Sequence, residues 1–287
     1  MIRILLILIS ISSLSAIAQN DYYYRIHPHW TRIVNGCLVM DVNLDGTDEF
    51  FFRIGDQYDL RDPELEFYYK SFKFSLEEPF LTEPIPASSM DSIYFLVNFQ
   101  HQDTIFVKLL PPSPKTMGKS LQQEPLLDLF RFVKNKRTAF SDFRQSFNYL
   151  SHIRTTTGKR LTLFSTSTPW DENGKRAVYA MDYKRQKLHW TFSHGPYLIN
   201  ARIVDINRDG SDEILLSSYA SNNGVSGQSS TDDSSYVFLL GSDGRVIWQR
   251  GFGGFWTGAF ADVGNFYGDG RPRVVCFQYS ISKTKTS

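Results

Sequence analysis

The 287-residue chain is predicted to be an all-β protein, and three features of its sequence indicate this. Twenty-three Phe, 15 Tyr and 5 Trp give it the aromatic composition that strands favour. Short apolar runs alternate with polar turns, as in Ser92–Leu110, which predicts two strands around a turn at Gln100–Asp103. Similar segments also recur along the chain. An apolar content of 41% is enough to form a substantial core in one large domain or two small ones.

Residues 1–18 are predicted to be a cleaved secretory signal peptide. Arg3 precedes the apolar run Ile4–Ile9, and Ala16-Ile17-Ala18 has the small-x-small pattern of a cleavage site. Serines interrupt the run before it reaches the roughly 20 residues that a membrane-spanning helix needs. We therefore expect a mature chain that begins near Gln19, has no membrane span and is secreted, periplasmic or at the cell surface. Its formal charge of +1 gives no electrostatic reason to expect nucleic acid as a partner.

The segments Asp41–Glu49 (DVNLDGTDE) and Asp205–Glu213 (DINRDGSDE) share one pattern. Each has oxygen-bearing side chains at positions 1, 3 and 5, glycine at position 6 and glutamate at position 9. Hard oxygen ligands at this spacing suit Ca²⁺, and the glycine permits a sharp turn that points the carbonyl of position 7 at the same centre. The predicted ligands are Asp41, Asn43, Asp45, Thr47 and Glu49 in one loop and Asp205, Asn207, Asp209, Ser211 and Glu213 in the other.

Other loop types fit this pattern less well. An EF-hand needs Glu at position 12 and flanking helices, whereas Phe52 and Leu216 stand there and apolar strands are predicted to follow. A dockerin has the same opening but continues into a helix. The remaining alternative is an acidic Asp-Gly turn without metal. Asp48 and Asp212, at position 8, are interpreted as solvated surface charges.

An internal repeat connects these loops to hairpins. Val178–Trp190 and Tyr236–Trp248 match in length, apolar opening, polar turn and closing Trp, and both predict hairpins. Aligning Tyr236 with Val178 gives an offset of 58 residues, and aligning Asn265 with Asp205 gives 60. The repeat is therefore about 60 residues long, a period typical of repeat architectures.

The segments VDINRDGSDEILLSS, MDVNLDGTDEFFF and VGNFYGDGRPRVV resemble the calcium loop and following strand of FG-GAP and VCBS repeats, the β-propeller blades also found in integrin α-chains. The resemblance implies that residues 19–287 form a β-propeller with four to five visible blades, either incomplete or closed by strands from both ends. It also implies structural Ca²⁺ in the first two loops. The third loop departs from the pattern, because Tyr267 and Arg273 replace ligands and Asp269 is its only carboxylate. We expect no calcium there. Ser151–Ser165 resembles a blade whose loop has lost its carboxylates.

A helical insertion is predicted at about residues 111–148. Pro111–Pro114 indicates an extended linker, and Pro125 stands where the first turn of a helix tolerates proline. Leu126, Leu127, Phe130 and Val133 then recur at helical spacing. A helix packed on the ring is the favoured interpretation, with a partner-binding arm or an irregular loop as alternatives.

The sequence contains no common catalytic motif: neither a Gly-x-Ser-x-Gly elbow, nor a phosphate-binding loop, nor a Cys-x-x-Cys pair occurs. Ser193-His194-Gly195 is interpreted as the exit of a hairpin, and His27 with His29 would make only a weak metal site. No catalytic residue is predicted. The favoured function is a non-catalytic binding or adhesion module for protein or polysaccharide, stabilised by calcium. The alternative is a carbohydrate-active enzyme domain or the sensing ectodomain of a larger signalling protein.

The sequence leaves open the role of two aromatic segments and the pairing of two cysteines. Tyr22–Trp30 and Gly251–Trp256 are candidates for an exposed binding patch, and core packing is the alternative for both. A closed ring could bring Cys37 and Cys276 together, and export permits a disulfide. An apolar strand such as Val274–Phe277 is also a common place for a free buried cysteine.

Overall fold

The structure is a computed structural model that describes residues 32–34, 37–54, 57–62, 68–73, 81–101, 104–112, 127–133, 146–167 and 175–280. These residues form an all-β fold, which confirms the predicted class. Two short 3₁₀ turns, η1 (Met90–Ser92) and η2 (Tyr183–Arg185), are the only helical elements among them. In this part of the chain there is no helix with the length and apolar character to span a bilayer. The predicted signal peptide lies outside the described residues.

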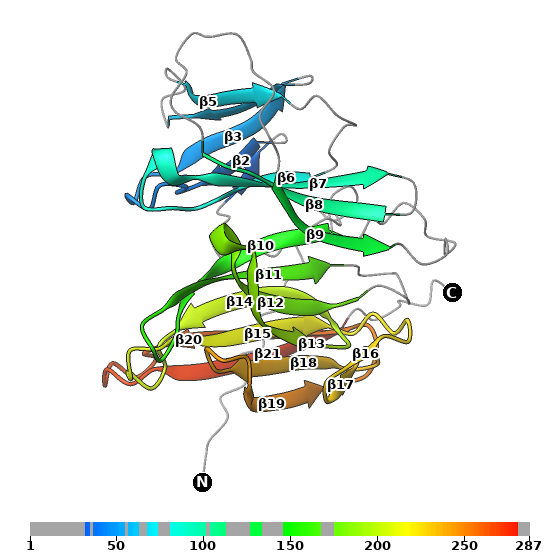
Figure 1. Ribbon diagram of the computed structural model, residues 1–287. Helices are drawn as coiled ribbons and strands as arrows, with labels where there is room; N and C mark the ends of the chain where they lie inside the picture. The colour runs from blue at the N-terminus through cyan, green and yellow to red at the C-terminus, as the bar shows by residue number, and fades with distance from the viewer. Residues whose placement is uncertain are drawn as a thin grey trace.

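Four antiparallel sheets follow one another in chain order (Figure 1). The first contains β1 (Arg32–Val34), β2 (Cys37–Met40), β3 (Glu49–Ile54), β4 (Gln57–Arg61) and β5 (Tyr68–Lys73). The second contains β6 (Leu81–Ile85), β7 (Tyr94–His101), β8 (Thr104–Leu110) and β9 (Leu127–Val133). The third contains β10 (Ser146–Arg154), β11 (Arg160–Ser167), β12 (Ala177–Asp182) and β13 (Lys187–Ser193).

The fourth sheet has six strands. Its members are β14 (Tyr197–Val204), β15 (Glu213–Tyr219), β18 (Ser235–Leu240), β19 (Val246–Phe252), β20 (Thr257–Gly264) and β21 (Arg273–Ser280). The hairpin of β20 and β21 joins the rest through two residue pairs between β15 and β20. A separate small hairpin, β16 (Ser226–Gly227) with β17 (Ser230–Thr231), extends from the connection between β15 and β18.

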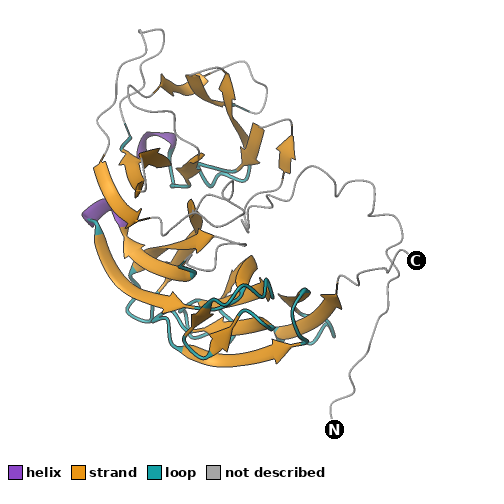
Figure 2. Ribbon diagram, turned by 90° about the vertical axis from the view of Figure 1, so that its right-hand side faces the viewer, coloured by secondary structure: helices purple, strands orange, loops and turns teal. Residues whose placement is uncertain are grey.

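The second, third and fourth sheets bury apolar side chains on both of their faces. On β7, Phe95 and Val97 belong to the core between the first two sheets, whereas Leu96 belongs to the core between the second and third. On β15, Leu216 packs toward the third sheet and Leu215 toward the hairpin of β20 and β21. Successive side chains of a strand point to opposite faces, so this alternation stacks the sheets face to face. The stack follows an arc and is partly propeller-like (Figure 2).

Polar contacts fix the second sheet against the third. Buried Asn98 accepts a hydrogen bond from the Phe147 amide (3.0 Å) and donates one to the Phe147 carbonyl (3.1 Å). The carboxylate of buried Glu83 accepts a hydrogen bond from the Tyr149 amide at 2.7 Å. Because a buried polar group without a partner costs free energy, these contacts favour one register between the two sheets.

The predicted hairpins are confirmed. Strands β7 and β8 form the predicted pair within Ser92–Leu110, and β12 with β13 and β18 with β19 form the two repeated hairpins. Strands also follow both acidic loops, as β3 and β15. The predicted insertion helix is wrong, because residues 127–133 form strand β9, which pairs with β8. Leu126, Leu127, Phe130 and Val133 match a helical period, but the opposite edge of β8 offers Leu127–Val133 a hydrogen-bonded partner, and tertiary pairing overrides a short local pattern.

Strand β21 lies at the edge of the fourth sheet and exposes apolar side chains. Val275, Phe277 and Tyr279 are 44%, 54% and 39% exposed, and Phe277 stacks on Phe260 with ring centroids 5.4 Å apart. No described strand pairs with the outer edge of β21. Cys276, on the other face of the strand, is free and half-buried, and burial raises the pKa of its thiol. An exposed apolar edge of this kind promotes association between chains.

We predict that the chain associates with itself through this edge. The association should appear in sedimentation velocity as an average mass that rises with protein concentration. Phe277→Lys should reduce it, because a charged side chain on an edge strand disfavours sheet addition. Phe255→Lys, at another exposed phenylalanine (57%), serves as the control and should leave it unchanged. A wild-type chain that stays monomeric at all concentrations would contradict this prediction.

Candidate functional site

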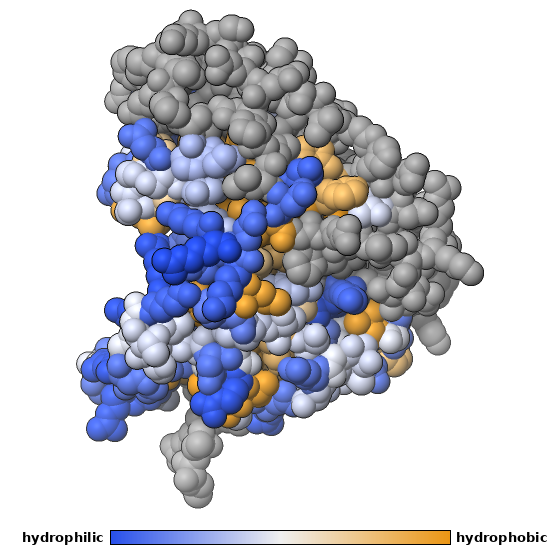
Figure 3. Space-filling model, in the orientation of Figure 1, coloured by the Kyte–Doolittle hydropathy of each residue, from blue (hydrophilic) through white to orange (hydrophobic). Residues whose placement is uncertain are grey.

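The two acidic loops occupy the same place in two different sheets. Residues 41–48 connect β2 with β3, and residues 205–212 connect β14 with β15, in each case as the link between paired antiparallel strands. The third loop, residues 265–272, connects β20 with β21 in the same way. These links lie on the left-hand side of Figure 1, where the described surface is largely hydrophilic (Figure 3).

The backbone of the two loops bends at the same positions. Leu44 and Arg208, at position 4, have φ values of 61° and 62°. Gly46 and Gly210, at position 6, have φ values of 92° and 88°. Glycine adopts this left-handed region without the steric cost that a Cβ atom brings. The glycine of the pattern is therefore required by the turn itself, since no other atom lies within 4 Å of the place where a Cβ would stand.

The loops also share their hydrogen bonds. In the first loop Asp41 accepts from the amides of Asp45 (3.1 Å) and Gly46 (2.9 Å), and Asp45 accepts from the amide of Thr47 (2.8 Å). The second loop repeats these contacts at 3.1, 3.0 and 2.8 Å through Asp205 and Asp209. Two segments far apart in the sequence thus fold into one geometry, which their shared residue pattern specifies.

The glutamate at position 9 closes each loop from the strand side. Glu49 is 1% exposed, and one of its oxygens accepts from the Val42 amide at 2.8 Å. Its other oxygen and an oxygen of Asp45 both accept from the side-chain amide of Asn43, each at 2.9 Å. In the second loop Asn207 joins Asp209 (2.9 Å) and Glu213 (3.3 Å) in the same way.

Burial makes these glutamates unusual acids. It raises the pKa of Glu49 to about 7, and the charges of Asp45 and Asp41 add to the effect. The pKa of Glu213 is raised for the same reasons, burial first. Within the described residues, no Lys, Arg or His forms an ion pair with either glutamate. A buried carboxylate that faces other carboxylates without a cationic partner is costly in its charged form.

The residues present fit a hard cation. Carboxylate oxygens of positions 5 and 9 converge on one amide group, and no described donor engages the carbonyl of Thr47 or Ser211. Oxygen donors of this kind are the ligands that Ca²⁺ takes. As the side chains stand, no three His, Cys, Asp or Glu groups of the described residues are clustered closely enough to hold a metal ion together. Ligation would therefore require the carboxylates of a loop to move closer together.

In the third loop a cationic side chain pairs with the one carboxylate. Arg273 donates to both oxygens of Asp269, at 2.8 and 2.5 Å, and stacks on Tyr267 with its guanidinium carbon 4.5 Å from the ring centroid. The arginine lowers the pKa of Asp269 well below its usual range. The third loop thus lacks the predicted calcium ligands of the other two loops and has an internal ion pair in their place.

Asp212 forms hydrogen bonds with the backbone of Arg154, so its interpretation as a solvated charge is wrong. Its carboxylate accepts from the amide of Arg154 at 2.6 Å, and its own amide donates to the Arg154 carbonyl at 2.8 Å. These contacts join the second acidic loop to the end of β10 in the third sheet. They also place the Arg154 guanidinium 3.9 Å from Asp205. Sequence patterns could not reveal this contact, since its partners are 58 residues apart.

His194 lies in a buried polar network at the opposite end of the strands. The network is centred on an ion pair between Arg176 and Asp232 at 3.1 Å, both almost fully buried. His194 is 1% exposed, and its Nδ1 lies 2.8 Å from the Pro196 carbonyl, so Nδ1 carries the proton. Its Nε2 has no hydrogen-bond partner among the described residues. Burial lowers the pKa of His194 to about 3. The arrangement is that of a neutral packing histidine at the exit of the hairpin of β12 and β13.

One of the two aromatic segments is exposed. Phe255 and Trp256, in the turn between β19 and β20, are 57% and 37% exposed. The Trp256 amide donates to the Ala220 carbonyl at 2.9 Å, and its ring lies edge-on to Tyr219 with centroids 6.4 Å apart. Core packing is thereby excluded for these two side chains. The other segment, Tyr22–Trp30, and the pair His27 and His29 lie outside the described residues.

The comparisons with known proteins assign no family. No protein-family model matches the chain, and no curated protein matches it. The resemblance to FG-GAP and VCBS repeats therefore rests on the residues of the loops and on the sheets that they connect.

The buried His194 predicts a specific dependence of stability on pH. A folded pKa of about 3 against an ordinary value of 6.5 means that, between these values, the unfolded chain binds more protons than the folded one. Stability should therefore fall as pH is lowered from about 6.5 toward 3, by up to about 1.4 kcal/mol per pH unit from this group. Urea unfolding of the wild type and of His194→Gln at several pH values measures the difference in slope. His189→Gln, at an exposed histidine, is the control. Equal slopes in wild type and His194→Gln would refute the assignment.

Proposed function

We propose that this chain is an exported, calcium-stabilised β-propeller of the FG-GAP and VCBS type that acts as a non-catalytic binding or adhesion module for protein or polysaccharide. The observation that carries the proposal is the repeated geometry of the two acidic loops. Both present the oxygen donors that suit Ca²⁺, and both stand at the same link between paired strands. Export, through the signal peptide at residues 1–18, would expose the loops to calcium concentrations that fill even weak sites.

Calcium at these loops would have a structural role. When bound, the ion would neutralise the converging carboxylates of Asp41, Asp45 and Glu49 and of Asp205, Asp209 and Glu213. Each set is held by the backbone of its own loop and lies at the end of a hairpin. The acids with raised pKa values, Glu49 and Glu213, belong to these separate loops. This distribution supports a scaffold in preference to the carbohydrate-active enzyme considered as the alternative.

The exposed aromatic turn supports a binding function. Trp256 is held by its backbone hydrogen bond to Ala220 and by its ring contact with Tyr219, so little freedom is lost when a partner covers it. Aromatic side chains dominate the energetics of many binding surfaces, because they bury a large area with few rotatable bonds. The turn lies at the end of the strands away from the acidic loops, so the two features can serve binding and stability separately.

The calcium proposal predicts a stability effect that one side chain controls. Binding to the folded state adds about 2.7 kcal/mol per site when calcium is at 100 times its dissociation constant. A chelator should therefore lower the melting temperature, and Asp209→Ala should produce part of this loss in calcium and remove one bound ion. Asp269→Ala, in the third loop, is the matched control and should leave the calcium count unchanged. If neither calcium nor chelator changes the melting temperature, the loops are acidic turns without metal.

The binding proposal predicts a role for the aromatic turn. Wild-type protein should be retarded in native gels that contain a soluble polysaccharide ligand, and Phe255→Ser should lose much of this retardation. Phe266→Ser is the control, because Phe266 is 53% exposed but lies in the third loop at the other end of the strands. Equal mobility of the two variants, in gels that retard the wild type, would exclude the turn as the binding surface.

A further inference from the structure

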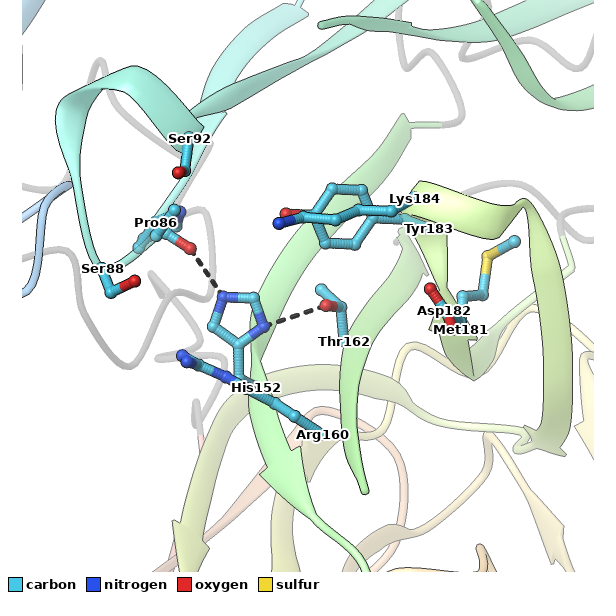
Figure 4. A pocket seen from close by; sticks show the side chains of 11 residues that line it. Pro86, Ser88, Ser92, His152, Arg160, Thr162, Met181, Asp182, Tyr183 and Lys184 are labelled. Carbon is cyan, nitrogen blue, oxygen red and sulfur yellow. Dashed lines mark hydrogen bonds between the residues drawn. The ribbon is translucent and has the colours of Figure 1, made fainter. Parts of the chain in front are cut away.

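A cavity of about 230 Å³ lies between the second and third sheets, at the end that carries the acidic loops (Figure 4). One wall is the link between β6 and β7, including Pro86, Ser88 and Ser92. The other wall comes from β10, β11 and η2 and includes His152, Arg160 and Lys184. The volume is below the roughly 300–1,000 Å³ of drug-sized sites and suits a small polar group.

Two cations face this cavity without carboxylate partners. The side chains of Arg160 and Lys184 are exposed, and neither forms an ion pair with any described residue. The Lys184 ammonium lies 5.8 Å from the ring centroid of Tyr94. In the view of Figure 4 the two cationic groups lie on either side of His152 and extend toward the link that carries Ser88 and Ser92.

The one carboxylate in the lining is already neutralised. Asp182 pairs with Lys159 at 3.6 Å and with Arg185 at 3.5 Å, and it also accepts from the Arg185 amide at 3.4 Å. Arg160 also acts on Tyr183, another residue of the lining. Burial raises the pKa of Tyr183 to about 12, and the nearby Arg160 opposes this rise because a guanidinium favours the phenolate. The cavity therefore has a net positive field, since two lining cations remain uncompensated.

The rest of the lining is rigid and rich in hydroxyl groups. His152 spans the two sheets, with Nε2 2.7 Å from the Pro86 carbonyl and Nδ1 2.9 Å from the Thr162 hydroxyl. The carbonyl can only accept, so Nε2 carries a proton. The Ser92 hydroxyl is 2.9 Å from that of Ser89, which holds the link in shape. Hydroxyl groups beside two cations are the donors that bind the oxygens of a small anion.

We propose that this cavity binds an oxyanion, a carboxylate, sulfate or phosphate group, which is either free or carried on an acidic sugar. Arg160 and Lys184 supply charge-assisted hydrogen bonds, and Ser88 and Ser92 bind the remaining oxygens. This inference specifies a ligand class for the proposed binding function. It rests on that function only in naming an acidic polysaccharide as one source of the anion. None of the acidic-loop residues lines the cavity.

Isothermal titration of the full chain in calcium-free buffer tests the proposal. The probes are sodium sulfate, inorganic phosphate and sodium glucuronate, with glucose as the uncharged control. At least one oxyanion should bind and glucose should not. Arg160→Gln and Lys184→Gln should each weaken binding about tenfold or more, because each removes a charged hydrogen bond. Asp182→Asn should strengthen binding, since it removes the one negative charge of the lining while its amide oxygen still accepts from the Arg185 amide.

Arg245→Gln is the matched control, because it removes the same charge at an exposed turn between β18 and β19. It should bind as the wild type does. Binding of glucuronate as well as sulfate would assign an acidic sugar as the source, and binding of the inorganic ions alone would assign a free or esterified inorganic group. The proposal is overturned if no oxyanion binds, or if Arg160→Gln and Lys184→Gln bind as tightly as Arg245→Gln. If calcium had no effect on the melting temperature, the oxyanion titration would still be expected to show binding. The calcium proposal and the oxyanion proposal can therefore fail separately.

Discussion

The second, third and fourth sheets have two apolar faces each, and they bury these faces against neighbouring strands and sheets. On β7, Phe95 points toward the first sheet and Leu96 toward the third, and both are fully buried. A fully buried side chain of this kind stabilises the fold by about 1.5–3 kcal/mol. Such a sheet on its own would leave both faces in water, so these sheets are stable as a stack. The arc of Figure 2 is the shape that this stacking produces.

Stacking also determines where functional groups can lie. The faces between neighbouring sheets are occupied by the core, and the candidate sites lie toward the two ends of the strands. One end carries the acidic loops and the cationic cavity, and the other carries the aromatic turn and the buried network of Arg176 and Asp232. Contacts between neighbouring links, such as that of Asp212 with Arg154, hold them in fixed positions. A ligand site at these ends is therefore built from residues that are distant in the sequence.

Local features of the chain were predictable from sequence, and contacts between sheets were not. The hairpins follow from short apolar runs on either side of polar turns, and the acidic loops from a pattern within nine residues. The helix predicted around Leu127–Val133 was wrong because a short apolar run fits both the helical and the strand period. Pairing with the edge of β8 decides between the two structures. The cavity was missed because its walls come from segments 66 residues apart, as His152 and Pro86 show. Asp212 was misjudged for the same reason.

The central claim is that the repeated geometry of the acidic loops serves to bind calcium. Anomalous diffraction from crystals of the protein grown in calcium would test it most directly, because it locates the ion independently of any assumed ligand. We expect one peak within each of the loops Asp41–Glu49 and Asp205–Glu213, and none within residues 265–273, where Arg273 pairs with Asp269. Well-ordered loops without a peak in either acidic segment would contradict it.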